Sequence, residues 1–360
     1  MVSSMMKQLG LWLCIPLLVA LLSLPYNHWE TDFLSFYAGA KLAGTGQLYS
    51  LGTLHDLQAV YERDPGQIRP FTRPAYYAVL LQPFSHFTFR TASVLWEILN
   101  VLAIGVFIWL WCRNTAHLVV LFPPLWFCLM AGQDAPLFLA AFAASVWLLR
   151  GNRPLLAGLV LAFCLVKFHL FLLLPLLIVA KRLWRLAAGI TLGGAFLLAV
   201  SFVVNGNWVP SFLTALRINE KYQEGASQMF NLTGLTWQLP FHWIWFAVGA
   251  SGVAIALWCC IRLMDINEAS ALTVVASVLV SAHAFGYDLT FLLPWITLHG
   301  YNRAMKFAIA TSVAILSVSQ HQYYLGQVIV FGIMIEDVFR HRDSGVLTTP
   351  IPAPPHFLGL

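Results

Sequence analysis

Charged residues are scarce in this sequence. Of its 360 residues, 20 are Lys or Arg and 15 are Asp or Glu, which is 10% of the chain, against about 25% in an ordinary soluble domain. Apolar residues make up 59%, and they form long runs separated by short basic clusters. This pattern predicts an all-α, polytopic membrane protein and excludes disordered, fibrous, disulfide-framework and soluble dinucleotide-binding proteins.

Several ligand signatures are missing as well. The sequence has no Lys/Arg-rich run and no patch of basic and aromatic residues, so we expect no nucleic-acid partner. The six cysteines form no CxxC pair and have no Cys/His ligand spacing, which favours small buried core residues over metal ligands. No Gly-rich phosphate loop and no clear internal repeat is present.

The apolar runs predict about twelve (10–13) transmembrane helices, because a helix needs about 20 residues to cross a bilayer. They lie near residues 8–25, 92–112, 115–131, 135–149, 154–166, 168–180, 186–204, 239–261, 269–286, 289–301, 304–319 and 323–338. The two short segments beside Lys167 fit a broken or re-entrant element equally well. The first segment is expected to be a retained signal anchor, because bulky Leu24, Pro25 and Tyr26 replace the small residues of a cleavage site.

The distribution of Lys and Arg predicts the orientation. Short loops on the side of Lys7 carry most of these residues, whereas the other side carries them mainly in two long loops, which count little in the positive-inside rule. We therefore expect both termini in the cytoplasm of a plasma (inner) membrane, with external loops at 26–91 and 205–238. Residues 1–342 would form one membrane domain, followed by a Pro-rich cytoplasmic tail at 343–360.

The first external loop begins with an acidic residue at the start of a helical pattern. Apolar residues at 33–42 predict an amphipathic interfacial helix, and residues 74–84 predict a second segment in or near the membrane surface. Asp32 precedes the first of these helices. Its carboxylate could cap the helix N-terminus or act as a general base on an acceptor hydroxyl, and the two roles are compatible.

Two arginines close the same loop beside tyrosines. Arg69 and Arg73 are four residues apart, and Tyr76 and Tyr77 follow. Guanidinium groups bind phosphate oxygens in a forked geometry, so this pair suits a phosphate at the membrane surface. Simple anchoring to lipid headgroups is the alternative.

Polar residues also interrupt the apolar segments. Lys167 and His169 stand within an apolar stretch, where a lysine costs roughly 2.5–3.5 kcal/mol unless it faces a cavity or a partner. Lys167 is therefore a functional candidate, with a structural salt bridge to Glu97 or Asp134 as the alternative. Gln133 comes directly before Asp134 at the end of another predicted span.

The last polar cluster ends a predicted span on the external side. His283, Tyr287 and Asp288 fall within six positions. Such side chains can bond a sugar or phosphate, or move a proton near neutral pH. The alternative is that they only cap a helix end.

Six segments occur in an order that resembles a known family. They are DFLSFYAGA at 32–40 with LY at 48–49, FTRPAYY at 71–77, LWEILN at 95–100, GQ at 132–133, LVKFH at 165–169 and SAHAFGYDLTFLLP at 281–294. They are similar to the DF…YYAA…LY, F.YPP, LW..LN, GQ, LKPQ and SPH…YDL.LLLP segments of family 87 glycosyltransferases. These are membrane enzymes of the GT-C superfamily that include the polyprenol-phosphate-mannose-dependent mannosyltransferases of phosphatidylinositol mannoside synthesis.

The resemblance implies transfer of a sugar, such as mannose, from a polyprenyl-phosphate donor to a lipid or glycan acceptor, among membrane lipids at the external leaflet. It implies that Asp32 is the catalytic base and that the anomeric carbon is inverted, with no cofactor, nucleotide or metal required. The donor phosphate is expected to contact Lys167, Arg69 and Arg73. The sugar and acceptor are expected to contact Tyr37, Tyr76, Gln133, His169, His283, Tyr287 and Asp288.

Two other classes of protein fit part of the pattern. A secondary transporter or lipid flippase also has a helical bundle with an intramembrane lysine, but its broken helices usually occur as symmetry-related pairs at the midplane. Here the polar residues gather at one edge, beneath two long loops, which favours interfacial chemistry. In a non-catalytic assembly subunit, Asp32 and Lys167 would be replaceable without consequence.

Overall fold

The structure is a computed structural model that describes residues 32–61, 69–222, 225–299, 306, 328–329 and 332–336. Within these ranges the chain is helical and contains no strand, so the all-α prediction is confirmed for the part described. The expected signal anchor at 8–25 and the tail at 343–360 lie outside the described residues, as do most of the expected spans at 304–319 and 323–338.

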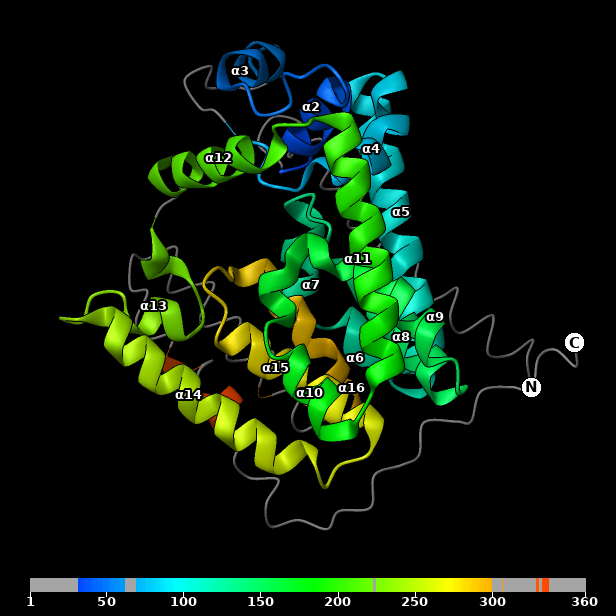
Figure 1. Ribbon diagram of the computed structural model, residues 1–360, viewed down its shortest axis with the longest axis vertical. Coiled ribbons are helices and arrows are strands. Elements are labelled where there is room, and N and C mark those ends of the chain that lie inside the picture. The colour runs from blue at the N-terminus through cyan, green and yellow to red at the C-terminus, as the bar shows by residue number, and fades with distance from the viewer. Residues whose placement is uncertain are drawn as a thin grey trace, which may run out of the picture.

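The helices follow one another with short connections (Figure 1), and η marks a 3-10 helix. In chain order they are α2 (Phe33–Leu42), α3 (Leu51–Ala59), α4 (Ala75–Leu81), η1 (Gln82–His86), α5 (Phe89–Trp111), η2 (Arg113–Thr115), α6 (Ala116–Val120), α7 (Pro123–Met130), α8 (Ala135–Arg150), α9 (Pro154–Leu161), η3 (Ala162–Phe171), α10 (Leu174–Lys181), α11 (Trp184–Val204), α12 (Trp208–Tyr222), η4 (Ala226–Gln228), α13 (Leu232–Thr236), α14 (His242–Ile261), α15 (Ile266–Leu279), η5 (Gly286–Leu292) and α16 (Leu293–His299).

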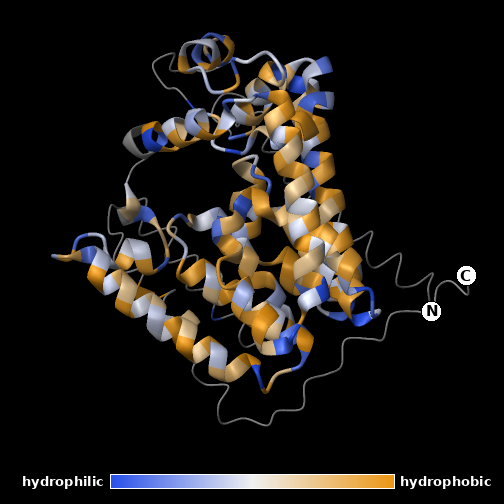
Figure 2. Ribbon diagram, in the orientation of Figure 1, coloured by the Kyte–Doolittle hydropathy of each residue, from blue (hydrophilic) through white to orange (hydrophobic). Residues whose placement is uncertain are grey.

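Four of the described helical segments are long and apolar enough to cross a membrane. They are α5, the continuous unit of α9 and η3, α11, and α14. Two shorter apolar helices, α8 and α15, accompany them. Apolar residues line these helices in Figure 2, and the outward-facing side chains of α11 and α14 include exposed Phe196 and Trp243. The protein is therefore helical with membrane-length segments, while the expected number of about twelve spans is not established.

The expected single span at 115–131 is two short helices instead. α6 ends at Val120, and α7 begins with Pro123 and Pro124. Proline has no backbone N–H and its ring clashes with the preceding turn, so it is tolerated in the first turn of a helix but not within it. The two prolines therefore start a new helix rather than continue the old one.

The helix expected at 33–42 is confirmed as α2, but the expectation that it is amphipathic is wrong. Every residue of α2 except Lys41 is buried. Phe33 stacks on Trp96 of α5 with a ring-centroid distance of 5.1 Å. Gly39 leaves room for Phe71, whose Cδ2 atom would lie 2.3 Å from a Cβ atom at that position. This helix is part of the core because neighbouring segments cover all of its faces.

α9 and α11 cross with their backbones in contact. A Cβ atom at Gly158 would lie 2.2 Å from the carbonyl oxygen of Leu186, and one at Gly189 would lie 2.2 Å from that of Leu155. Small residues allow this close approach between membrane helices. The crossing fixes the unit of α9 and η3, which carries Lys167, against α11.

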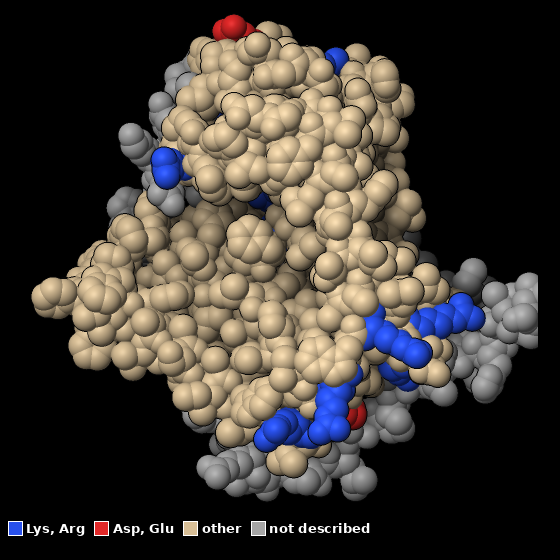
Figure 3. All heavy atoms as spheres, in the orientation of Figure 1, with Lys and Arg blue, Asp and Glu red and all other residues tan. Residues whose placement is uncertain are grey.

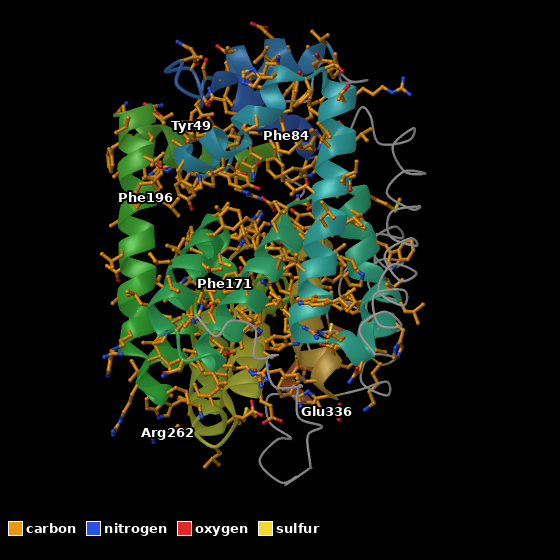
Figure 4. All side chains as sticks on the ribbon, turned by 90° about the vertical axis from the view of Figure 1, so that its right-hand side faces the viewer. Tyr49, Phe84, Phe171, Phe196, Arg262 and Glu336 are labelled. Carbon is orange, nitrogen blue, oxygen red and sulfur yellow. The ribbon has the colours of Figure 1, made fainter. Side chains whose placement is uncertain are left out.

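Basic residues gather at one end of the bundle. The turns between α8 and α9, α10 and α11, and α14 and α15 lie together at the lower end of Figure 1, and Figure 3 shows the cluster on the surface there. These turns carry Arg150, Arg153, Lys181, Arg182, Arg185 and Arg262. Figure 4 shows Arg262 at this end, Phe171 in the middle, and Tyr49 and Phe84 at the opposite end.

Candidate active site

Four interruptions of the helices meet in the interior and bring the polar residues together. They are the start of α2 at Asp32, the turn between α7 and α8 at residues 131–134, a bend in η3 at Lys167, and the segment that leads into η5. Lys167 has non-helical φ and ψ angles of −113° and 49°, which agrees with a broken element, one of the interpretations that the sequence left open. Side chains at such breaks can face inward without competing for the regular hydrogen bonds of a helix.

Lys167 is the centre of a buried ionic network. Its Nζ atom lies 2.8 Å from Asp288 Oδ1, 3.1 Å from Asp134 Oδ1 and 3.3 Å from Gln133 Oε1. The side chains of Lys167, Asp134 and Asp288 are each 2% exposed or less. Of the two salt-bridge partners considered for this lysine, Asp134 is therefore confirmed, while the second carboxylate among the described residues is Asp288 and not Glu97. A buried charge needs such compensation because desolvation is costly.

Arg73 extends the network from the loop before α4. Its Nε atom lies 3.2 Å from Asp134 Oδ2, and its Nη2 atom lies 3.5 Å from Asp134 Oδ1. The guanidinium also stands 5.4 Å from the ring centroid of Phe36. The sequence did not reveal this pair, because 61 positions separate the partners. The only available signal was the general need for each buried carboxylate to find a cation.

Asp32 is the most accessible carboxylate of this cluster. Its side chain is 36% exposed, against 0% for Asp134 and 1% for Asp288. Gln133 Nε2 donates a hydrogen bond to Asp32 Oδ2, and Arg69 Nη1 lies 3.5 Å from Asp32 Oδ1. Gln133 therefore connects the accessible Asp32 to the buried Lys167.

The expected capping role of Asp32 is wrong for its side chain. The carboxylate makes no capping hydrogen bond to α2. Instead the backbone N–H of Asp32 donates to the carbonyl of Ala131 over 3.0 Å, and its carbonyl accepts from Ser35 and Phe36. The backbone thus anchors this residue and leaves the carboxylate available for other contacts.

The pKa values of Asp32 and Asp134 are shifted in opposite directions. Burial raises the pKa of Asp32 above its ordinary value, although Arg69 and the hydrogen bond from Gln133 oppose that rise. Burial alone would also raise the pKa of Asp134, but Arg73 and Lys167 hold it at about 2. Asp134 is therefore a permanent anion, whereas Asp32 has the greater affinity for a proton.

Aromatic rings adjoin the network on the side of Lys167. Its Nζ atom lies 5.3 Å from the ring centroid of Tyr287, which stacks on Phe127. The rings of His169 and His283 meet edge to face with centroids 5.8 Å apart. Burial lowers the pKa of His283 to about 4, so this imidazole is neutral near pH 7 and can both donate and accept hydrogen bonds.

Two expected sugar-binding tyrosines make other contacts. The Tyr37 hydroxyl donates to the carbonyl of Phe87 over 2.8 Å, and its ring packs on Phe89. Tyr76 is buried, with a backbone N–H that donates to Ser201 Oγ. Its hydroxyl has no hydrogen-bond partner among the described residues. The structure does not bring Tyr37 into the cluster, so its expected role has no geometric support.

The surface is hollowed beneath α12, and Lys or Arg atoms are visible inside the hollow (Figure 3). Within the described ranges, no group of three His, Cys, Asp or Glu residues is arranged to hold a metal ion. Asp134 and Asp288 are already paired with cations. The arrangement therefore offers an accessible carboxylate next to several positive charges.

A family comparison agrees with the geometry. The model of glycosyltransferase family 87 matches residues 71–285. This range contains Arg73, the turn at 131–134, Lys167 and His283, and it begins after Asp32. Neither a curated protein nor a solved structure matches the chain.

Proposed function

Because this chain belongs to glycosyltransferase family 87, we propose that it transfers a sugar from a polyprenyl-phosphate donor to a lipid or glycan acceptor. Family membership makes the protein a glycosyltransferase that acts on a sugar donor and an acceptor. Its apolar helices indicate a membrane protein. We further propose that the transferred sugar is mannose, another hexose or a pentose, and the mechanism, the residues and the side of the membrane are part of the same proposal.

The observation that carries the proposal is the difference in accessibility among the three carboxylates. Asp32 is 36% exposed, whereas Asp134 and Asp288 are closed off and paired with cations. A general base must reach within hydrogen-bond distance of the proton that it removes. Asp32 meets this requirement without any rearrangement, so it is the base in the proposed mechanism.

The proposed reaction is a single displacement. Asp32 takes the proton of an acceptor hydroxyl while the acceptor oxygen forms a bond to the anomeric carbon of the donor sugar. The bond between that carbon and the phosphate oxygen breaks, and polyprenyl phosphate leaves with the electron pair. Attack from the face opposite the leaving group inverts the anomeric carbon. One base and a stabilised leaving group suffice for this step.

The cations would stabilise the leaving phosphate in two ways. Arg69 is 24% exposed and adjoins Asp32, so we assign it the direct contact with a phosphate oxygen. Arg73 and Lys167 are buried against Asp134, and they would act through their electric field unless the donor displaces a carboxylate. Gln133, His169, His283 and Tyr287 adjoin the same region and would contact the sugar and the acceptor, whereas Asp288, which is closed off and paired with Lys167, would act through that lysine.

The proposed orientation follows from the basic end of the bundle. Lys and Arg residues are concentrated in the cytoplasmic loops of membrane proteins, and the turns at the lower end of Figure 1 carry such residues. α2 lies toward the opposite end. We therefore place Asp32 on the extracytoplasmic side of a plasma membrane.

Transfer from a radiolabelled polyprenyl-phosphate sugar, measured with the purified protein in lipid vesicles, tests the proposal. Asp32→Asn should reduce the rate by about 10²–10⁴-fold, the usual contribution of a general base. Asp56→Asn is the matched control, because Asp56 has an 84% exposed side chain on α3. Full activity in Asp32→Asn contradicts the mechanism. Movement of the lipid-linked sugar across the vesicle without a new glycosidic bond supports a transporter or flippase instead.

A further inference from the structure

Three successive carbonyl groups of the turn between α7 and α8 accept hydrogen bonds from other parts of the chain. Ala131 accepts from the backbone N–H of Asp32 over 3.0 Å. Gly132 accepts from Trp96 Nε1 over 2.9 Å, and Gln133 accepts from Asn100 Nδ2 over 3.1 Å. The turn is therefore attached on one side to α2 and on the other side to α5.

The two donors on α5 stand one helical turn apart on the same face. Positions i and i+4 of a helix are neighbours on its surface, so the side chains of Trp96 and Asn100 both contact the turn from one face of α5. Both side chains are fully buried. Trp96 also stacks on Phe33, the residue after Asp32. One indole ring thus contacts both segments that carry the candidate active-site groups.

Asn100 is kept in the interior at a cost. Its Oδ1 atom is buried and has no hydrogen-bond partner among the described residues. An unsatisfied buried polar atom destabilises the fold because its desolvation is not compensated, and an apolar residue of similar volume at this position would avoid that cost. The hydrogen bond from Nδ2 to the carbonyl of Gln133 is the contact that offsets this cost.

The position of the turn determines the surroundings of the base. Gln133 donates to Asp32 and accepts from Lys167, so a displacement of its backbone would loosen both contacts. Gly132 has a φ angle of +64°, in the left-handed region that residues with a Cβ atom adopt at a cost. The turn therefore has a specific conformation that its three hydrogen bonds hold in place.

We propose that Trp96 and Asn100 are positioning residues of the active site, which hold the turn at 131–134 so that Gln133 orients the Asp32 carboxylate. The inference depends on the proposed function of Asp32 as a base. Trp96 and Asn100 do not touch the substrate. They act through Gln133, and their loss reduces the rate of the bound complex more than the affinity for the donor.

A second tryptophan of the same helix provides the control. Trp111 Nε1 donates to the carbonyl of Pro294 over 3.0 Å, and its ring is also buried. Trp96→Phe and Trp111→Phe therefore each remove one buried indole hydrogen bond from α5. Only the first of these bonds ends on the turn that carries Gln133. Any general effect on folding should be similar in the two variants.

The measurements are Tm, kcat, the KM for the donor and the pH dependence of kcat/KM. We expect Trp96→Phe and Asn100→Leu to lower kcat at least tenfold with KM changed less than threefold. Their acid limb should move to higher pH, because the hydrogen bond from Gln133 lowers the pKa of Asp32. Trp111→Phe should keep the kcat and pH profile of the wild type. Leucine at position 100 fits an apolar interior, so this variant remains informative if Trp96→Phe fails to fold.

The outcomes separate the two hypotheses. A wild-type protein without transferase activity, or a fully active Asp32→Asn variant, overturns the proposed function. An active wild type and an inactive Asp32→Asn variant, combined with unchanged kcat and pH profiles in Trp96→Phe and Asn100→Leu, overturn only the positioning role. Equal losses of activity in Trp96→Phe and Trp111→Phe also overturn it, because both then reflect general damage to α5.

Discussion

Arg69 and Asp32 adjoin each other at the accessible side of the ionic cluster, with Arg69 Nη1 3.5 Å from Asp32 Oδ1. Both side chains are partly exposed, at 24% and 36%. A base and a phosphate ligand must stand close together if one site is to deprotonate an acceptor and stabilise a leaving phosphate. The pair provides this proximity before any substrate binds.

The first prediction concerns Arg69. Arg69→Ala should raise the KM for the donor at least tenfold, because it removes the accessible guanidinium that we assign to the phosphate. Arg69→Lys should recover only part of the affinity, since an ammonium group cannot form the forked contact. Steady-state kinetics with the polyprenyl-phosphate sugar measures both. Arg90→Ala, at an exposed arginine of α5, is the control, and an Arg69→Ala variant with the KM of this control contradicts the assignment.

The second prediction concerns pH. The base must be ionised to act, so activity falls as the pH decreases through the pKa of Asp32. Burial raises this pKa, and the acid limb of kcat/KM should therefore lie above the value of about 3.9 for an ordinary aspartate. Arg69→Ala should move the limb further upward, because the guanidinium lowers the pKa. If the acid limb of Arg69→Ala lies at the same pH as that of the wild type, the group that titrates is not Asp32.

The third prediction concerns the stability of the ionic network. Lys167→Met should lower the free energy of unfolding by roughly 3–5 kcal/mol, the cost of leaving buried carboxylates without their cation. Asp288 makes the shortest contact with this lysine, 2.8 Å. The double variant Lys167→Met/Asp288→Asn should therefore be more stable than the single variant. Thermal unfolding in detergent measures the stability order of the wild type, the single variant and the double variant. Equal stability of the wild type and Lys167→Met would contradict a structural role and leave donor binding as the role of the lysine.

Apolar length predicted the long helices well. The expected spans at 92–112, 135–149, 186–204 and 239–261 correspond to α5, α8, α11 and α14, with boundaries that differ by at most three residues. Long apolar runs determine such helices without help from the rest of the chain. Where prolines divide a run, as before α7, hydropathy alone overestimated the length.

The remaining features of the fold and of the candidate site could not be predicted, because they depend on packing between segments that are distant in the chain. The burial of α2 depends on α4, η1 and α5, which no local pattern in residues 33–42 describes. The sequence identified Lys167, Arg73 and Asp288 by residue type, but their partners lie 33 to 121 positions away. Trp96 and Asn100 donate hydrogen bonds to backbone carbonyl groups. Every residue has such a group, so the sequence does not indicate which one a side chain contacts.

The charged groups of the cluster come from places where helices begin, end or bend, while α11 and α14 face outward with exposed apolar side chains. α11 and α14 thus add membrane-length apolar surface without contributing a charged group to the cluster. The lipid-facing surfaces of α11 and α14 could be redesigned for a thicker or thinner membrane, or for a different detergent, with the reaction centre left intact.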